Sequence, residues 1–358
     1  VERMKKVLIV GDGKSPIIDK NFIDYLTKNN NYIFDILSFK EITSNKYNKI
    51  YSIPQVINNK FYRLNSLKFL FAFVLKGIRI IRKYDIVHFH MFYPGIFFLT
   101  PFFKQNVVLT LWGSDVLKSN KFKKMLLGFT LKRVKTVTCT NPSFRNKIIE
   151  YYPFISNKIE VFPYMLKYIE LVNSSYLNKT HSKKTRIVVG SNSNSSQNHL
   201  EMLNAIKESN LDVNNLHLII PLSYGRGSID YKLQITNLVK SINCTYDIIT
   251  KKLNDQELTN LRLNCEVFIN LQDTDQLSGA MLETLCADNI VITGSWLNYD
   301  VLKCSGVSFY EIDEIFDLTS LLNSINLKKR PVNRDIIISE YLPKNVLFKW
   351  LSTYEKVL

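Results

Sequence analysis

The sequence predicts an α/β protein built from two doubly wound domains that face each other across a cleft. The chain has 358 residues, which is more than a single hydrophobic core usually fills. Short runs rich in valine and isoleucine alternate with helix-length segments, a rhythm typical of parallel sheets covered by helices. The rhythm breaks once near the middle of the chain and then resumes, which indicates two domains rather than one.

The strand-length runs divide the chain into expected domains. In the first half they are residues 6–11, 84–90, 106–111 and 136–140, and in the second half 186–190, 216–221, 246–249, 265–271 and 289–293. A polar, basic stretch between the two series is interpreted as a linker. We therefore expect an N-terminal domain over 1–165, a linker over 166–185, a C-terminal domain over 186–330, and a helical segment over 331–358 that can pack back on the N-terminal domain.

Composition limits the partners and the compartment. The net charge is +16, which favours anionic partners such as phosphates or an acidic membrane surface. Five widely spaced cysteines suggest free thiols rather than disulfides or a zinc site. We find neither a secretion signal nor an apolar run of about 20 residues, so we expect a cytoplasmic protein that does not span a membrane.

Functional groups in doubly wound folds lie at the carboxyl ends of the strands. In the first half this rule selects Gly13, His90 and Asp115. Gly11 and Gly13 form a G-x-G without a third glycine, so a dinucleotide-binding dehydrogenase is disfavoured. His88 and His90 lack a third metal ligand, and we expect no zinc. A histidine near a carboxylate can orient an acceptor hydroxyl, although both histidines can equally be structural.

The stretch "DQLSGAMLETLCADNIVITGS", residues 275–295, is the most informative part of the sequence. A helix is expected to begin near Ser278 and Gly279, where free backbone N–H groups favour an anion such as a diphosphate. Glu283 lies one turn further along, where its two oxygens can bind a ribose diol. The alternative is a structural helix with one partly solvated glutamate.

This stretch resembles the E(x7)E motif of GT-B glycosyltransferases, with Asp275 and Glu283 in the two acidic positions. The first acid is Asp instead of Glu, and Asp288 stands where the pattern commonly has Gly. "YDIVHFHMFYPG" and "VVLTLWGSDVL" resemble N-terminal segments of the same superfamily. The resemblance implies a GT-B fold, a sugar-facing Asp275, a ribose-binding Glu283, and His90 and Asp115 on the acceptor side.

A second turn, "VVGSNSNSSQNHLEML", follows the strand at 186–190. A strand, a run of Ser and Asn, and then a helix form a natural phosphate or sugar turn, here at Gly190, Ser191 and Asn192. The E(x7)E enzymes carry an Arg and a Lys at this point, whereas this chain has neutral residues. The missing cations are expected from Arg226, which lies close to Tyr224, or from Lys252.

Over residues 84–302 the chain distantly resembles the TDP-Fuc4NAc:lipid II Fuc4NAc transferases. That resemblance implies transfer of a sugar from a nucleotide-sugar to a lipid-linked saccharide in bacterial polysaccharide biosynthesis, such as O-antigen or capsule. No cofactor is implied beyond the nucleotide-sugar donor.

Two basic clusters in the first half are interleaved with Leu, Phe and Ile. The clusters are Arg63, Lys68, Lys76, Arg79, Arg82 and Lys83, and then Lys118, Lys121, Lys123, Lys124, Lys132 and Arg133. Such helices are typical of anionic membrane interfaces, which predicts a protein peripheral on the inner face of the cell membrane. A merely solvated helix face is the alternative. No motif for reading nucleic acid accompanies the charge, so we expect no nucleic-acid partner.

Two other functions stay open from the sequence. Asp273 and Asp275 can be read as the DxD metal site of a GT-A glycosyltransferase, although such sites lie earlier in those chains. A two-lobed sugar-binding protein without catalytic activity would share the fold.

Overall fold

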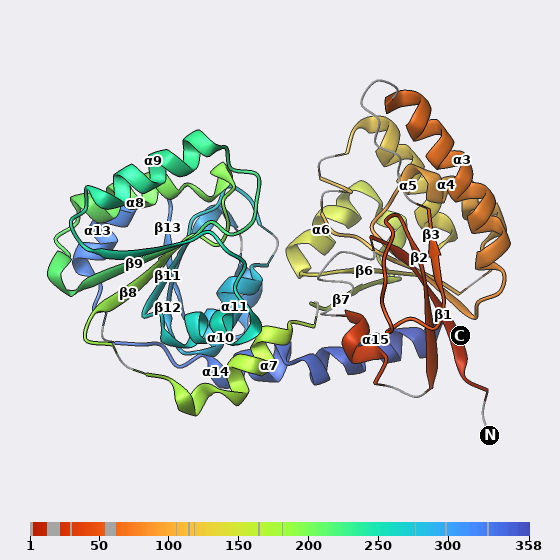
Figure 1. Cartoon of the computed structure of the whole chain (residues 1–358). Coiled ribbons are helices and arrows are strands. Elements are labelled where there is room, and N and C mark those ends of the chain that lie inside the picture. Colours follow the sequence, from red (N-terminus) through yellow and green to blue (C-terminus); the bar gives the residue numbers. More distant parts are fainter. Residues whose placement is uncertain are drawn as a thin grey trace. The chain divides into compact units, whose positions relative to one another are not determined.

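The computed structural model describes residues 3–12, 22–28, 31–53, 62–104, 106–113, 115–117, 119–163, 165–180, 182–275, 277–297, 299–327 and 329–358, with side chains omitted for 62–66. The chain forms two compact units. Unit 1 contains residues 1–165 and 343–358, and unit 2 contains residues 166–342. Each has a parallel sheet with helices on both faces (Figure 1).

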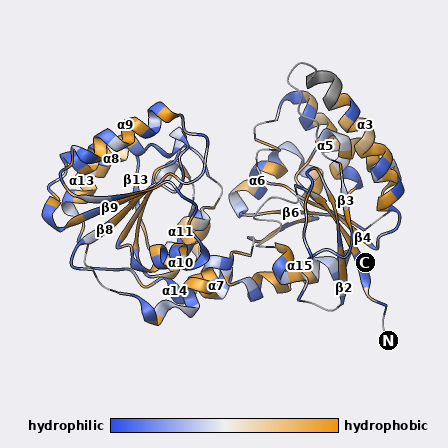
Figure 2. Ribbon diagram, in the orientation of Figure 1, coloured by the Kyte–Doolittle hydropathy of each residue, from blue (hydrophilic) through white to orange (hydrophobic). Residues whose placement is uncertain are grey.

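Unit 1 contains a seven-stranded parallel sheet. Its order is β3 (Ile50–Ser52), β2 (Tyr32–Ser38), β1 (Lys5–Gly11), β4 (Ile86–His90), β5 (Val107–Thr110), β6 (Thr136–Cys139) and β7 (Ile159–Val161). Leu8 and Val10 of β1 pack on one face while Val7 and Ile9 pack on the other. Because both faces are buried, the strands are mostly apolar, as their hydropathy shows (Figure 2).

The helices of unit 1 separate onto the two faces of this sheet. On one face lie α3 (Tyr62–Ile81), α4 (Pro94–Leu99), α5 (Lys121–Arg133) and α6 (Pro142–Tyr151), with the short helices η3 (Thr100–Phe102) and η4 (Pro153–Ile155). On the other face lie α2 (Asp24–Leu26) and α15 (Pro343–Val357). Trp350 and Tyr354 of α15 are buried there, and this apolar face explains why the last helix belongs to unit 1.

Unit 2 contains a six-stranded parallel sheet. Its order is β10 (Thr245–Ile249), β9 (Leu216–Pro221), β8 (Thr185–Val189), β11 (Val267–Asn270), β12 (Ile290–Gly294) and β13 (Tyr310–Ile312). One face is covered by α8 (His199–Glu208), α9 (Ile229–Lys240) and α13 (Asp317–Ser324). The other is covered by α7 (Lys167–Ser174), α10 (Asp255–Asn264), α11 (Gly279–Cys286), α12 (Asp300–Cys304) and α14 (Arg334–Tyr341).

The stretch predicted to be a linker is instead part of unit 2. It contains α7, which packs against α10 and α11, and its Ile169 and Val172 are fully buried. After α7, the Nζ of Lys179 donates a hydrogen bond to Asn289 Oδ1 at 2.8 Å. This helix is short and lies among many polar residues, so its few apolar positions do not form a recognisable pattern in the sequence.

Two other expectations concern the chain as a whole. All five cysteines are free thiols, and Cys139, Cys265 and Cys286 are buried. Across the described ranges, none of the helices combines the length and the apolarity needed to span a bilayer.

Candidate functional site

The predicted donor-site residues of the second half all lie at one edge of the unit 2 sheet. They follow β8 (Gly190, Ser191 and Asn192), β9 (Tyr224 and Arg226), β10 (Lys252) and β11 (Asp275, Ser278, Gly279 and Glu283). These four strands are neighbours in the order β10, β9, β8, β11, and all run parallel. Their carboxyl ends therefore bring together turns that are far apart in the sequence.

The turn after β8 requires a glycine at its first position. Gly190 has a φ of +68°, and a Cβ there would lie 2.6 Å from Nε2 of His199. The next residue, Ser191, donates from its backbone N–H and its hydroxyl to Oε1 of Gln197, at 2.9 and 3.0 Å. The turn is thus held by Gln197 of the short helix η6 (Ser195–Gln197), and the absence of a side chain at Gly190 leaves room for the His199 ring.

The turn after β9 packs directly on the turn after β8. The backbone N–H of Ser193 donates to the carbonyl of Tyr224 at 2.7 Å, and that of Arg226 donates to Asn194 Oδ1 at 2.7 Å. A Cβ at Gly227 would lie 1.9 Å from the carbonyl oxygen of Ser193, so this contact also requires glycine. The two turns form one structure from which the exposed side chains of Tyr224 and Arg226 extend.

A chain of side-chain hydrogen bonds joins the turn after β8 to Asp275. Gln197 Nε2 donates to Gln272 Oε1 at 2.8 Å, and Gln272 Nε2 donates to Asp275 Oδ2 at 2.9 Å. The hydroxyl of Tyr299 donates to the same oxygen at 2.7 Å. Burial, together with this carboxylate, raises the pKa of Tyr299, which therefore stays a protonated donor. Asp275 is thus held in place by groups from two further segments.

Asp273 has a different environment from Asp275. Its side chain is exposed, and its Oδ1 accepts a hydrogen bond from Asn198 Nδ2 at 2.9 Å. Within the described ranges, no group of three or more His, Cys, Asp or Glu side chains is placed to hold a metal ion. The two-sheet architecture also differs from the single nucleotide domain on which the GT-A interpretation of these two residues depends.

Helix α11 begins where the sequence predicts, and its first turn faces the same edge. Ser278 caps it by accepting a hydrogen bond from the Met281 N–H at 3.2 Å. Glu283 is only 6% exposed, and its Oε2 accepts a hydrogen bond from Arg262 Nε at 2.9 Å. Burial raises the pKa of Glu283, while the Arg262 guanidinium opposes that rise. Arg262 therefore already binds one of the two oxygens, and binding of a ribose diol by Glu283 stays a prediction.

His90 lies at the end of β4, as the sequence predicts, but its side chain is buried. It is 1% exposed, and its ring packs among Phe22, Trp112 and Trp350. Within the described part of the chain, neither of its ring nitrogens has a hydrogen-bond partner. Burial lowers its pKa to about 3, so the ring is neutral at physiological pH. A role for His90 towards the acceptor stays a prediction.

The neighbouring His88 is a core residue. Its Nδ1 lies 2.8 Å from the Tyr354 hydroxyl of α15 and its Nε2 lies 2.7 Å from Thr110 Oγ1. Both ring nitrogens are therefore satisfied inside unit 1, in agreement with the structural alternative for this residue.

Asp115 joins the loops that follow β4 and β5. Its Oδ2 accepts a hydrogen bond from the Phe92 N–H at 3.1 Å, and its Oδ1 accepts one from the Trp112 N–H at 3.0 Å. Burial raises the pKa of Asp115 to about 6, although these backbone hydrogen bonds oppose the rise. The adjoining Met91 has a φ of 82°, a left-handed conformation that is rare outside glycine and is found at strained functional loops.

The raised pKa of Asp115 predicts a specific pH dependence of stability. Because the folded-state pKa of about 6 exceeds the unfolded value, the folded state binds the extra proton as the pH falls. The free energy of unfolding of wild-type unit 1 should therefore rise by about 1.4 kcal/mol as the pH falls from 7 to 5, because of this group. Asp115→Asn should lack that gain. Urea unfolding followed by tryptophan fluorescence at both pH values measures it, and equal shifts in both proteins would contradict the assignment.

Gly13, the remaining predicted site residue, lies outside the described residues. In the basic clusters, Lys118 and the side chain of Arg63 also lie outside them.

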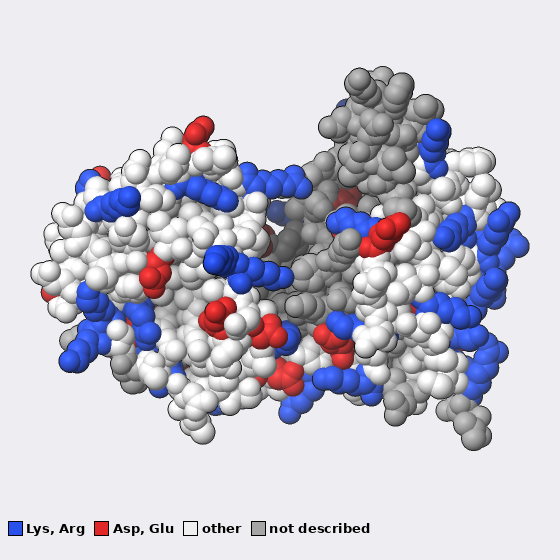
Figure 3. Space-filling view, in the orientation of Figure 1, with Lys and Arg blue, Asp and Glu red and all other residues white. Residues whose placement is uncertain are grey.

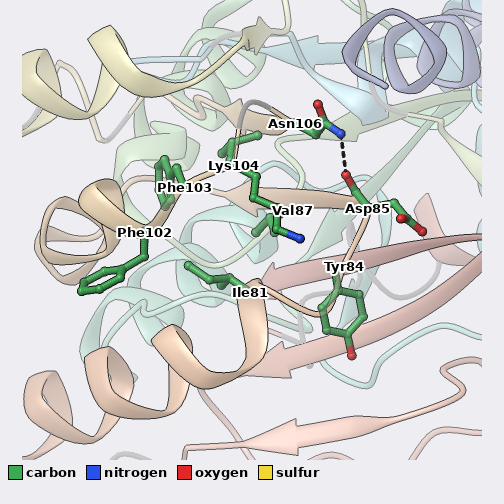
Figure 4. A pocket seen from close by; sticks show the side chains of 9 residues that line it. Ile81, Tyr84, Asp85, Val87, Phe102, Phe103, Lys104 and Asn106 are labelled. Carbon is green, nitrogen blue, oxygen red and sulfur yellow. Dashed lines mark hydrogen bonds between the residues drawn. The ribbon is translucent and has the colours of Figure 1, made fainter.

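One small pocket of unit 1 lies away from these groups. Figure 4 shows it between Ile81, Val87, Phe102 and Phe103, with Asn106 donating to the carbonyl of Asp85 at its rim. Asp85 and Asn106 precede β4 and β5, so the pocket opens at the amino ends of these strands, opposite His90 and Asp115.

Unit 1 also exposes large apolar side chains on three adjacent helices. They are Leu67, Phe71 and Leu75 on α3, Phe98 on α4, and Phe122, Met125 and Phe129 on α5. Helix α4 contacts both α3 and α5, and all three cover the same face of the sheet. We call these seven residues the aromatic face.

Exposed cations surround the aromatic face. They are Lys68, Arg79, Lys121, Lys123, Lys132 and Arg133. Lys132 Nζ lies over the rings of Phe129 and Phe154, 5.7 Å from each centroid, and Figure 3 shows the basic side chains gathered along the edge of unit 1 where α3 runs. Apolar and cationic groups are therefore interleaved on one surface.

Several residues of the site were not predicted from the sequence. Arg262 and Tyr299 bind Glu283 and Asp275, respectively, from other segments. Gln272 binds Asp275 from three residues away, and Gln197 joins this network through Gln272. One signal in the sequence points to Arg262. It stands between Leu261 and Leu263, and a charge between two apolar residues of a helix suggests a buried partner.

Comparison with known proteins supports the same fold and enzyme class. A profile of Glycosyltransferase Family 4 matches residues 31–164, which lie in unit 1. No curated protein sequence matches the chain.

Solved structures of the same fold cover nearly the whole chain. A glycosyltransferase from Rickettsia africae is 16% identical with a TM-score of 0.74, and each chain covers 99% of the other. HepE from Anabaena in complex with UDP is 13% identical with a TM-score of 0.73, covering 99% of this chain and 100% of its own. Sucrose-phosphate synthase from Thermosynechococcus elongatus is 12% identical with a TM-score of 0.71, at 99% coverage of each. The family match in unit 1 and the GT-B fold of the whole chain together identify this protein as a glycosyltransferase.

Proposed function

We propose that this glycosyltransferase moves a sugar from a nucleoside-diphosphate sugar, held by unit 2, to a lipid-linked saccharide at an anionic membrane surface that contacts unit 1. The product would be a bacterial surface polysaccharide such as O-antigen or capsule, made on the inner face of the cell membrane. The observation that carries the proposal is the convergence of four polar turns at the carboxyl ends of β10, β9, β8 and β11.

The donor half of the proposal rests on how these turns are built. Gly190 and the first residues of α11 follow the neighbouring parallel strands β8 and β11, and a helix N-terminus favours negative charge. Oε1 of Glu283 is directed towards this helix start, lying 3.8 Å from the position of a Cβ on Gly279. We assign the diphosphate to Gly190, Ser191, Ser278 and Gly279, the ribose to Glu283, and the sugar to Asp275.

The diphosphate also needs cations, which the turn after β8 lacks. The side chain of Arg226 is exposed. Its turn packs against residues 190–194, because the backbone N–H of Arg226 donates a hydrogen bond to Asn194 Oδ1. Lys252 is exposed after the next strand outward. We propose that these side chains and the helix ends, rather than a metal ion, balance the leaving diphosphate.

A turnover assay tests the proposed reaction. The purified chain is incubated with UDP-, TDP-, GDP- and ADP-sugars together with a membrane lipid extract, in buffer with EDTA, and release of the nucleoside diphosphate is measured. One donor class should release its diphosphate, with release increased by the lipid extract and unchanged by EDTA. Binding of a donor without any release would instead indicate a sugar-binding protein, and loss of activity in EDTA would favour a metal-dependent enzyme.

The membrane half of the proposal rests on the aromatic face. It gathers seven exposed large apolar side chains on three adjacent helices, with Phe71 at 67% and Phe122 at 61%. On α5 they lie at positions 122, 125 and 129, which is one stripe of a helix. A peripheral membrane surface is expected to combine two kinds of side chain. Apolar groups enter the lipid interface, and neighbouring lysines contact the anionic headgroups.

Substitution of the α5 stripe tests membrane binding. The triple variant Phe122→Ser, Met125→Ser, Phe129→Ser should lower co-sedimentation with phosphatidylglycerol vesicles by roughly ten- to a hundredfold, because each side chain loses part of the 1.5–3 kcal/mol of burial. Ile229→Ser with Leu233→Ser on α9 of unit 2 is the matched control, since both side chains are also exposed. Equal sedimentation of wild type and triple variant would rule out this surface.

A further inference from the structure

Arg262 and Glu283 form a buried ion pair in unit 2, with 2.9 Å between Arg262 Nε and Glu283 Oε2. The side chains are 7% and 8% exposed, respectively, and the pair joins α10 to α11 across the face of unit 2. Charged side chains are almost never this buried unless they are paired. Both members are therefore fixed by the fold before any ligand binds.

Arg262 is held on several sides. Its guanidinium lies over the ring of Phe268 in β11, 5.6 Å from the centroid, and its backbone carbonyl accepts a hydrogen bond from Asn289 Nδ2 at 2.7 Å. Helix α10 itself is tied to α7, where Tyr168 donates to Asp255 Oδ1 at 2.8 Å. The guanidinium has little freedom to follow a moving carboxylate, so it determines where the carboxylate lies.

The contact uses one atom from each side chain. Nε of Arg262 donates to Oε2 of Glu283, whereas no described residue accepts from Nη1 of Arg262. A bidentate pair would occupy both oxygens of the carboxylate. The single contact instead directs Oε1 towards Gly279, at the start of α11.

We infer that Arg262 is a positioning residue for the donor site: it keeps Glu283 ionised and rotated so that Oε1 meets the ribose hydroxyls. The inference rests on the proposed function. Burial alone would favour the neutral carboxyl group, which is a weaker acceptor than a carboxylate. The Arg262 charge opposes that effect. Arg262 does not touch the nucleotide in this arrangement, and it acts only through Glu283.

Nucleotides that lack the ribose hydroxyls separate this role from a purely structural one. Binding is measured by calorimetry for UDP, thymidine diphosphate, GDP and ADP, each beside its 2′,3′-dideoxy counterpart, with wild type, Arg262→Lys and Arg262→Gln. For the diphosphate that binds wild type, both variants should weaken binding roughly tenfold or more, and Arg262→Gln more than Arg262→Lys. Binding of the dideoxy form should change less than twofold in either variant.

The outcomes are distinguishable. Equal weakening of the ribose and dideoxy nucleotides would show general damage to unit 2 and would overturn the inference, as would unchanged binding of both. Arg262→Lys retains a buried cation, so it provides the measurement if Arg262→Gln does not fold. In a Glu283→Gln background, Arg262→Lys should have no further effect on ribose selectivity. If wild type binds none of the diphosphates, the proposed function itself fails and this inference falls with it.

Discussion

Replacing Glu283 with alanine is expected to weaken nucleoside-diphosphate binding by roughly a hundredfold, because a charged acceptor of the ribose hydroxyls is lost. The same change leaves the buried Arg262 without its partner. Breaking a buried pair from one side costs about 3–5 kcal/mol, so the free energy of unfolding should fall by that amount. Calorimetric titration and urea unfolding measure the two effects separately.

A double variant separates the loss of binding from the loss of stability. Arg262→Met with Glu283→Leu removes both charges and fills the space with apolar groups, a change that is often neutral for stability. Its unfolding free energy should return close to that of wild type while nucleotide binding stays weak. Wild-type affinity in Glu283→Ala would show that the carboxylate does not bind the ribose.

Asp275→Asn is expected to lower kcat by roughly a hundredfold or more and to leave nucleoside-diphosphate affinity within about threefold of wild type. The asparagine keeps the shape of the side chain and an oxygen for the Tyr299 hydroxyl, but it removes the charge that we propose faces the sugar. Steady-state kinetics with the donor identified by the turnover assay measure kcat, and diphosphate titration measures the affinity.

Asp273→Asn is the matched control for this change. Asp273 lies two residues away, is exposed, and binds Asn198 rather than the Tyr299 network. Its substitution should leave kcat nearly unchanged. A similar loss in both variants would favour the alternative in which Asp273 and Asp275 hold a metal together.

The long apolar strands of both sheets could be predicted from the sequence, but four strands could not. Three of these, β3, β7 and β13, have only three residues each, too few for a pattern. The fourth, β2, carries Asp35 at its centre, and a charge there breaks the apolar run. In the fold this buried carboxylate accepts hydrogen bonds from the Tyr84 hydroxyl and the Lys49 N–H, at 2.6 and 2.8 Å, respectively. Its partners come from outside the strand, so a local pattern cannot show them.

Asp288 is a residue at which this chain differs from the E(x7)E pattern that its sequence resembles. This residue has a φ of 51°, the left-handed conformation for which glycine is the usual choice and which Asp tolerates. Its Oδ1 also accepts hydrogen bonds from the N–H groups of Asn333 and Arg334, at 2.7 and 2.8 Å. The carboxylate thus secures the start of α14, a contact that glycine could not make.

The candidate site was predictable where local chemistry determines it and not where tertiary contacts do. The glycine at 190 and the helix start at Ser278 follow from turn and capping rules, and the structure has both features. The pairing of Glu283 with Arg262 and the enclosure of His90 depend on which helices cover the sheet. The spacing of residues in the sequence does not show which helices these are.

Calorimetric titration of the wild-type chain with UDP, thymidine diphosphate, GDP and ADP, and with the corresponding monophosphates, tests the donor site most directly. One diphosphate should bind, and at a hundred times its Kd it should stabilise the chain by about 2.7 kcal/mol in a matching unfolding experiment. Its monophosphate should bind at least roughly tenfold more weakly, because the turn at Gly190 and the start of α11 are assigned to the diphosphate and a monophosphate lacks half of it. Equal binding of the two forms, or no binding of any diphosphate, would contradict the proposed donor site.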